Sequence, residues 1–380
     1  MAQGNKVMGI PQLLQFNTLL ILGALFLGII GSQLLSSNLG GNSIPITVVI
    51  LLLALGLLVV SADFFIEGAK GLARRGGIPE VVIGLTIVSI GTSLPEILVT
   101  STAALDVENN PEVADFAIGG ILGSVLVQIT LILGFVAVSR GLNIRPSWLK
   151  RDGQIMMLSL LLLAFFLITN NEITRLEGFI LTALYVSYVS WLLINRKEIQ
   201  EEESNSAEKI DLKALSWTGA AYFVMVFIGL SLAVFAAHYL VESASDIAYE
   251  MNVPHSLIGT VVSGLGTSLP ELTIALMAAN RSQGVAIGTL IGSNITDPLL
   301  SIGSASMIHP LSLTDAGSEM ILILILPATI LCTAVALFMM RTAYEFRRWE
   351  GAVLIILYLS VYYTHLRAHE TQPYLVSRLL

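Results

Sequence analysis

The segment Gly91-Thr92-Ser93-Leu94-Pro95-Glu96 occurs a second time, 175 positions later, as Gly266-Thr267-Ser268-Leu269-Pro270-Glu271. Each copy lies within a long apolar run and ends in a carboxylate. An ionisable side chain inside a bilayer is costly, so its presence there indicates a functional site. Two carboxylates in the same six-residue setting point to one site built from two copies of a segment.

The composition is typical of a membrane protein. Of the 380 residues, 55% are hydrophobic and 12% are charged, and the mean hydropathy is +0.82. Soluble domains carry about 25% charged residues, roughly twice this share. The single cysteine, Cys332, excludes an intrachain disulfide and a cysteine-based metal site. No catalytic Ser/His/Asp set, phosphate-binding loop or His-Glu-x-x-His motif indicates an enzyme, and no basic patch indicates a nucleic-acid partner.

Eleven apolar runs are candidates for spanning a bilayer, which takes about 17–25 residues, and only the last run is shorter than this. They cover residues 13–36, 46–69, 82–105, 117–138, 154–170, 177–195, 217–240, 256–279, 285–308, 320–340 and 351–364. The sequence therefore predicts an all-α integral membrane protein. A signal peptide is the alternative for residues 13–36, but no Ala-x-Ala-like cleavage site follows them, so we predict a retained extra helix within residues 1–45.

The distribution of Lys and Arg predicts the orientation, because cytoplasmic segments are enriched in both. With a cytoplasmic N-terminus and eleven spans, 16 of the 19 Lys and Arg residues fall in cytoplasmic segments. Only Arg175, Arg367 and Arg378 fall outside. This orientation places the hydrophilic linker 196–216 in the cytoplasm and assigns no role to the polar tail 365–380.

The repetition extends well beyond the hexapeptide. At the offset of 175, Ile83-Gly84 matches Ile258-Gly259, and after a shorter loop Gly123-Ser124 matches Gly292-Ser293. Two repeats, 46–195 and 217–364, then hold five predicted spans each. Because five is odd, the second repeat enters the membrane from the opposite side. The predicted fold is a ten-helix core of two inverted-topology repeats plus the extra N-terminal helix.

Inverted repeats build secondary transporters, whose ion sites lie near the midplane on interrupted helices. Pro95 and Pro270 lack a backbone N–H and so predict such interruptions within the two hexapeptides. The spans that follow add further oxygen ligands. The candidate ligands are Glu96, Glu271, Asp297, Gln128, Thr92, Ser93, Thr267, Ser268, Ser124 and Ser293. Oxygen-only sets of this kind suit hard cations such as Ca²⁺. Close helix packing is an alternative role for Ser124 and Ser293, since each follows a glycine.

A Gly-Ser pair follows the first hexapeptide 27 residues after Glu96 and the second 21 residues after Glu271, there within Gly292-Ser293-Asn294-Ile295-Thr296-Asp297. In this the two segments resemble the α-repeats of the sodium/calcium exchanger branch of the cation/Ca²⁺ antiporter family. The resemblance covers ten of the eleven spans and implies one Ca²⁺ site flanked by Na⁺ sites, formed by the candidate ligands. It also implies no cofactor, no obligate protein partner, and a compact prokaryotic type in the plasma (inner) membrane.

Two positions depart from the family pattern. Gln128 stands where members usually have Asn, and Val125 stands where a small polar residue is common. The extra methylene of Gln128 leaves the ion stoichiometry open. Sodium coupling is preferred because the Gly-Asn-x-x-Glu-His pattern of proton-coupled calcium exchangers is absent. Proton-coupled Ca²⁺ exchange and, from another class, an uncoupled cation channel are the alternatives.

Overall fold

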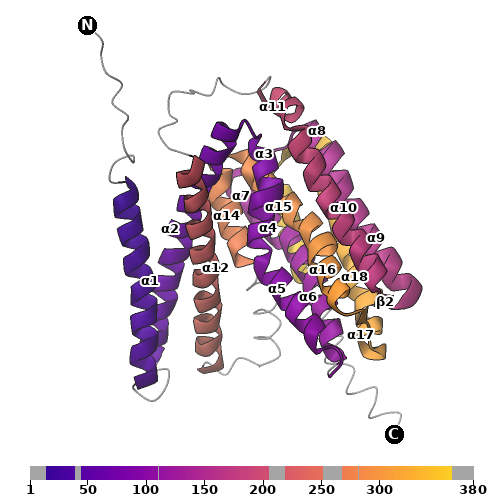
Figure 1. Cartoon of the computed structure of the whole chain (residues 1–380), viewed down its shortest axis with the longest axis horizontal. Helices are drawn as coiled ribbons and strands as arrows, with labels where there is room; N and C mark the ends of the chain where they lie inside the picture. Colours follow the sequence, from indigo (N-terminus) through magenta and orange to yellow (C-terminus); the bar gives the residue numbers. More distant parts are fainter. Residues whose placement is uncertain are drawn as a thin grey trace.

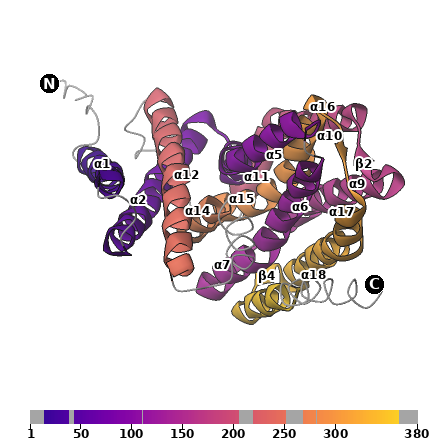
Figure 2. The same ribbon diagram turned by 90° about the horizontal axis from the view of Figure 1, so that it is seen from below.

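The computed structural model describes residues 14–38, 44–109, 111–204, 219–250, 268–280 and 282–361. Three long helices, α1 (Leu14–Asn38), α2 (Ile44–Gly76) and α12 (Gly219–Glu250), stand side by side at the left of the bundle (Figure 1). The remaining helices form a larger group to their right, and the view from below shows the same division (Figure 2).

The described part of the chain contains eight helices that are long and apolar enough to cross a membrane. A ninth results if Glu80–Thr92 and Leu94–Asp106, which are bent by 46° against each other, count as one span. Of the predicted span 256–279, only the shorter helix Leu269–Ala279 lies within the described residues. The all-α membrane architecture is thus confirmed, while the count of ten core helices stays a prediction.

Several spans are interrupted by single turns of π-helix, named η here. The first half contains α3 (Glu80–Ile83), η1 (Gly84–Val88), α4 (Ser89–Thr92), α5 (Leu94–Asp106), α6 (Glu112–Val127), η2 (Gln128–Ile132), α7 (Leu133–Arg140), β1 (Leu142–Asn143), α8 (Pro146–Trp148), η3 (Leu149–Gly153), α9 (Gln154–Asn170), β2 (Glu172–Ile173), α10 (Arg175–Ile194) and α11 (Arg196–Ser204).

After α12, the second half follows the same plan. It contains α14 (Leu269–Ala279), α15 (Gln283–Thr296), η5 (Asp297–Ser301), α16 (Ile302–Ile308), β3 (Leu311–Ser312), α17 (Asp315–Met320), η6 (Ile321–Ile325), α18 (Leu326–Ala343), β4 (Glu345–Phe346) and a helix over 348–361.

The helices extend beyond the apolar runs that predicted them. Helix α2 continues to Gly76, past the predicted end at residue 69, and the span predicted at 154–170 starts at Pro146. Part of the predicted linker 196–216 is helical as α11. The length of an apolar run matches the thickness of the hydrocarbon layer. A helix can be longer, because it continues until a cap or a proline ends it.

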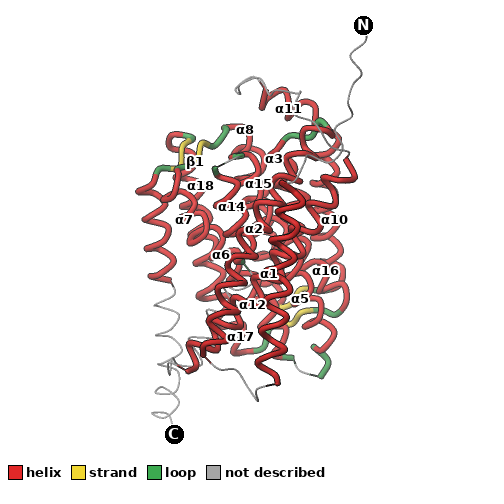
Figure 3. The backbone as a smooth tube through the Cα atoms, turned by 90° about the vertical axis from the view of Figure 1, so that its left-hand side faces the viewer, coloured by secondary structure: helices red, strands yellow, loops and turns green. Residues whose placement is uncertain are grey.

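The short strands establish that the two halves are inverted. Strand β1 pairs with β4 and β2 pairs with β3, both antiparallel. In the repeat, β1 corresponds to β3 and β2 to β4. The helix Pro146–Asn170 separates β1 from β2, so the two strand pairs lie at opposite ends of the bundle (Figure 3). Equivalent strands therefore lie at opposite ends, which requires the second half to run upside down relative to the first.

Close helix packing at glycines brings the two halves into contact. A Cβ atom at Gly84 would lie 2.8 Å from the Cα atom of Gly288, and a Cβ atom at Gly288 would lie 2.5 Å from the carbonyl oxygen of Val81. The position equivalent to Gly288 in the first half is Gly119. A Cβ atom there meets only the Ile321 side chain, at 3.7 Å.

The contrast between Gly288 and Gly119 gives a prediction. Gly288→Ala is expected to lower the free energy of unfolding by about 1–3 kcal/mol, because the added methyl group collides with backbone atoms. Gly119→Ala places the same methyl group at ordinary contact distance and is expected to be tolerated. Thermal unfolding of the two purified variants in detergent measures the difference. Equal midpoints would contradict the packing described for Gly288.

Candidate cation site

Both hexapeptide glutamates lie in the first turn of a helix that starts within the motif. Helix α4 ends at Thr92, and α5 starts after Ser93 with Glu96 in its first turn. Helix α14 starts after Ser268 with Glu271 in the same place. A proline occupies an early position of both helices, where its missing N–H costs nothing. The partial positive charge of a helix N-terminus favours carboxylates at these positions.

The serine preceding each of these helices is not used as a cap. Neither Ser93 nor Ser268 makes a side-chain capping hydrogen bond. Serine usually binds the second or third backbone N–H of the helix from this position. Both hydroxyls are buried and turn toward the space between the two halves instead.

Two further predicted ligands, an amide and a carboxylate, lie in equivalent π-helical turns of the two halves. Gln128 is the first residue of η2, and Asp297 is the first residue of η5, at the repeat offset of 169. A π-helical turn inserts one residue into an α-helix and is frequent at functional sites. Both side chains are fully buried.

Ser124 connects the two halves at the centre of the site. Its hydroxyl shares a 3.0 Å hydrogen bond with the hydroxyl of Ser268 and donates to Oε1 of Glu96 at 3.4 Å. Nε2 of Gln128 donates to the same hydroxyl at 2.9 Å. One small side chain therefore contacts residues from α5, η2 and α14.

Gln128 connects this cluster to Asp297. Its Nε2 donates to Oδ2 of Asp297 at 3.0 Å, while its own Oε1 remains without a hydrogen-bond partner. The Gln128 amide nitrogen thus donates to the Asp297 carboxylate, and the amide oxygen is left buried without a donor. The extra methylene that distinguishes glutamine from asparagine gives the side chain the reach for both Ser124 and Asp297.

Several buried oxygen atoms of this region have no hydrogen-bond partner. They are Oδ1 of Asp297, both carboxylate oxygens of Glu271, Oε1 of Gln128 and Oγ of Ser93. Buried polar atoms without partners are rare and costly, so a group of them indicates a missing ligand. Nearly all of these atoms are acceptors, so their chemistry suits a cation.

The remaining predicted residues border this group. Thr92 and Ser293 hydroxyls lie 3.4 Å apart, joining α4 to α15. Thr92 also neighbours Glu271, and Ser93 neighbours Asp297. Glu271 and Asp297 are close enough to repel each other when both are ionised. A cation between them would remove that repulsion.

The three carboxylates do not form a closed metal cluster on their own. Among the described residues, no three His, Cys, Asp or Glu side chains lie close enough to hold one metal ion. Glu96 is instead joined to Asp297 through Ser124 and Gln128. Thr267, the remaining predicted ligand, lies outside the described residues.

A chain of hydroxyls beside Asp297 contains none of the predicted ligands. The hydroxyl of Thr296 lies 3.1 Å from those of Ser89 and Tyr185, and all three side chains are buried. Asn294 is also buried, with its Oδ1 lacking a partner. A signal was present in the repeat, since Asn294 and Thr296 align with Val125 and Val127 of the first half.

Comparison with known proteins identifies the family. The family model described as sodium/calcium exchanger protein matches residues 46–194 and 221–366. A sodium/calcium exchanger of Methanosarcina acetivorans, MaX1, is 31% identical over 352 residues, covering 83% of this chain and 97% of the relative. The inner membrane protein YrbG of Escherichia coli is 30% identical over 264 residues, covering 69% and 79%.

A solved structure supports the same relationship. The sodium-calcium exchanger NCX_Mj, soaked with zero Na⁺ and Ca²⁺, superposes with a TM-score of 0.68 at 26% identity, covering 85% of this chain and 99% of that one. The family model covers both halves of the bundle, including the two interrupted helices. The chain therefore belongs to the sodium/calcium exchanger protein family.

Proposed function

We propose that this protein exchanges Na⁺ for Ca²⁺ by alternating access at one site between Glu96, Glu271, Asp297 and Gln128. The observation that carries the proposal is the group of buried acceptor oxygens without hydrogen-bond partners at the interrupted helices. Oxygen ligands of this kind bind hard cations such as Ca²⁺ and need no cofactor. Family membership supports the choice of ions, since the relatives include sodium/calcium exchangers.

The charge of the site supports competition between the two ions. When ionised, Glu96, Glu271 and Asp297 carry a charge of about −3, which three Na⁺ would neutralise and one Ca²⁺ would reduce to about −1. A proton on one acid, which we assign to Asp297, would remove the remaining charge. Burying a net charge is costly, so the loaded site can be closed off from water while the empty site cannot. This difference would couple the movement of one ion to that of the other.

The arrangement in the membrane follows from the inverted halves. We propose that residues 46–195 and 217–364 each form one five-helix repeat, with the ion site between them. Apart from Arg175, the described Lys and Arg residues belong to helix ends and connections next to β1, β4 and α11, and Figure 3 shows β1 and α11 at the same end of the bundle. The positive-inside rule supports a cytoplasmic location for that end, and the prokaryotic relatives support a plasma membrane.

Ion fluxes in proteoliposomes test the coupling. An outward Na⁺ gradient is expected to drive ⁴⁵Ca²⁺ uptake, and a pH gradient without Na⁺ is expected to drive none. Uptake driven by pH alone would favour proton coupling. Uptake that depends on no counter-ion would show a channel, and either result would overturn Na⁺/Ca²⁺ exchange.

Neutralising one carboxylate tests the site. Glu271→Gln is expected to reduce Na⁺-driven Ca²⁺ uptake by about 100-fold or more, because the substitution removes a charged ligand while keeping the shape of the side chain. Glu96→Gln is expected to act in the same way. The matched control is Glu345→Gln, which removes the same charge from an exposed residue of β4. Wild-type uptake in Glu271→Gln would rule out the assigned site.

The bridging amide gives a further prediction. Gln128→Leu removes the hydrogen bonds to Ser124 and Asp297 and is expected to weaken Ca²⁺ binding by on the order of 10-fold, measured by isothermal titration calorimetry. Thr130→Val is the control, because the Thr130 hydroxyl lies on the same π-helical turn but binds only the carbonyl of Leu126. A Gln128→Leu affinity equal to that of the control would show that the amide has no part in ion binding.

A further inference from the structure

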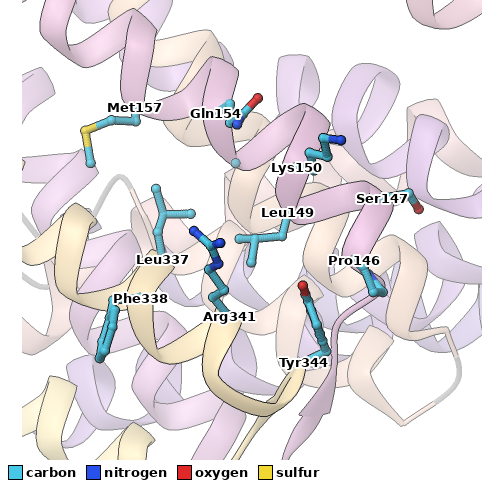
Figure 4. A pocket seen from close by; sticks show the side chains of 11 residues that line it. Pro146, Ser147, Leu149, Lys150, Gln154, Met157, Leu337, Phe338, Arg341 and Tyr344 are labelled. Carbon is cyan, nitrogen blue, oxygen red and sulfur yellow. The ribbon is translucent and has the colours of Figure 1, made fainter.

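A second pocket lies far from the ion site, at the end of the bundle formed by β1 and β4. It has a volume of about 610 Å³ and opens between the first turns of the helix Pro146–Asn170 and the last turns of α18. The side chains of Lys150, Gln154, Leu337, Arg341 and Tyr344 are among those that line it (Figure 4).

The outer part of this pocket is positively charged. The guanidinium of Arg341 and the hydroxyl of Tyr344 point from the end of α18 toward the facing helix, which carries Lys150 and Gln154 (Figure 4). Neither Lys150 nor Arg341 forms an ion pair with an acidic residue of the described chain. No Asp or Glu is among the residues that line the pocket. Two positively charged residues therefore line the pocket, and no acidic residue lines it.

The inner part of the pocket is apolar and faces outward from the bundle. Leu337 and Phe338 precede Arg341 by about one helical turn, and Met157 lies two turns beyond Lys150 on the facing helix. The Phe338 side chain is 68% exposed. The pocket thus has a cationic end at the membrane surface and an apolar wall that continues toward the membrane interior.

The inverted repeat shows that these cations are not a requirement of the fold. Lys150 is the fifth residue after the N-cap Arg145, and the fifth residue after the equivalent cap Thr314 is Glu319. Arg341 lies three residues before the C-cap Tyr344, and Ile168 lies three residues before the equivalent cap Asn171. At the opposite end of the bundle, an acid and an aliphatic residue therefore replace the two cations.

Tyr344 adds a conformational argument. Its φ angle is +51°, in the left-handed region, and the equivalent cap Asn171 has a φ angle of +52°. Asparagine adopts this conformation readily, whereas a bulky aromatic residue does so at a cost. A hydrogen bond from the Tyr344 hydroxyl to a group bound in the pocket would explain a tyrosine at this position.

We propose that this pocket binds an anionic phospholipid. The phosphate group would lie between Lys150, Arg341 and the Tyr344 hydroxyl, and an acyl chain would follow Met157, Leu337 and Phe338. Basic pockets between membrane helices on the cytoplasmic side bind anionic head groups, and nearby cations contribute to that affinity. The apolar wall next to the cations favours a lipid over a free phosphate, because one lipid molecule can place its phosphate at the cations and an acyl chain along the wall.

Native mass spectrometry of the full-length protein in detergent tests the proposal with phosphatidylglycerol as the probe. The wild-type protein is expected to bind it at least about 10-fold more tightly than phosphatidylcholine. The variant Lys150→Gln/Arg341→Gln is expected to lose that preference. The control Lys197→Gln/Arg348→Gln removes the same charge from exposed residues outside the pocket and is expected to keep it.

Three results would overturn the proposal. They are equal wild-type affinity for the two lipids, an unchanged preference in Lys150→Gln/Arg341→Gln, and displacement of the lipid by millimolar glycerol 3-phosphate, which would show a site for free phosphate. Lys150 and Arg341 are exposed, so both substitutions should leave the fold intact. Should the double variant unfold, Arg341→Gln alone is expected to lose about 3-fold or more in affinity, and no loss would equally reject the site.

Discussion

The structure depends on the burial of carboxylates that have no cationic side chain to neutralise them. Glu271 and Asp297 are fully buried, and in the described part of the chain neither forms an ion pair with Lys or Arg. Removing a carboxylate from water costs several kcal/mol even after the protein relaxes. Hydrogen bonds offset only part of this free energy. Asp297 accepts one from Gln128, and the two carboxylate oxygens of Glu271 accept none. A cation bound between them, as proposed above, would supply the missing positive charge.

The backbone is arranged to bring these groups together. The break at Ser93 and the start of α14 after Ser268 place both glutamates at helix N-termini, where the dipole favours their charge. The π-helical turns at Gln128 and Asp297 are set in equivalent helices of the two halves. The strand pairs at both ends and the close packing of Gly84 on Gly288 hold the halves in register. The ligands can therefore be positioned before an ion arrives, which lowers the cost of binding.

Much of the site followed from residue types and spacing. The hexapeptides identified both glutamates because charge within an apolar run is rare, and the offset of 169 paired Gln128 with Asp297. The hydroxyl chain of Ser89, Thr296 and Tyr185 could not be found in this way. It joins three helices that are distant in the chain, and Ser, Thr and Tyr are common enough in membrane helices to carry no signal alone. The proposed lipid pocket was equally hidden, since Lys150 and Arg341 line one pocket only when the two halves pack together.

The sequence by itself determined the membrane class, the repeat and its inversion, because hydropathy and an odd number of spans per repeat are properties of the linear chain. It also predicted which residues could supply oxygen ligands, from their type and their place in the repeats. Only the tertiary structure decided how they connect: Ser124 joins Glu96 to Ser268, and Gln128 reaches Asp297 with its nitrogen rather than its oxygen. The physical reason is that hydrogen bonds depend on distances of a few tenths of an ångström. Such distances are set by how helices from opposite halves pack, which no local pattern encodes.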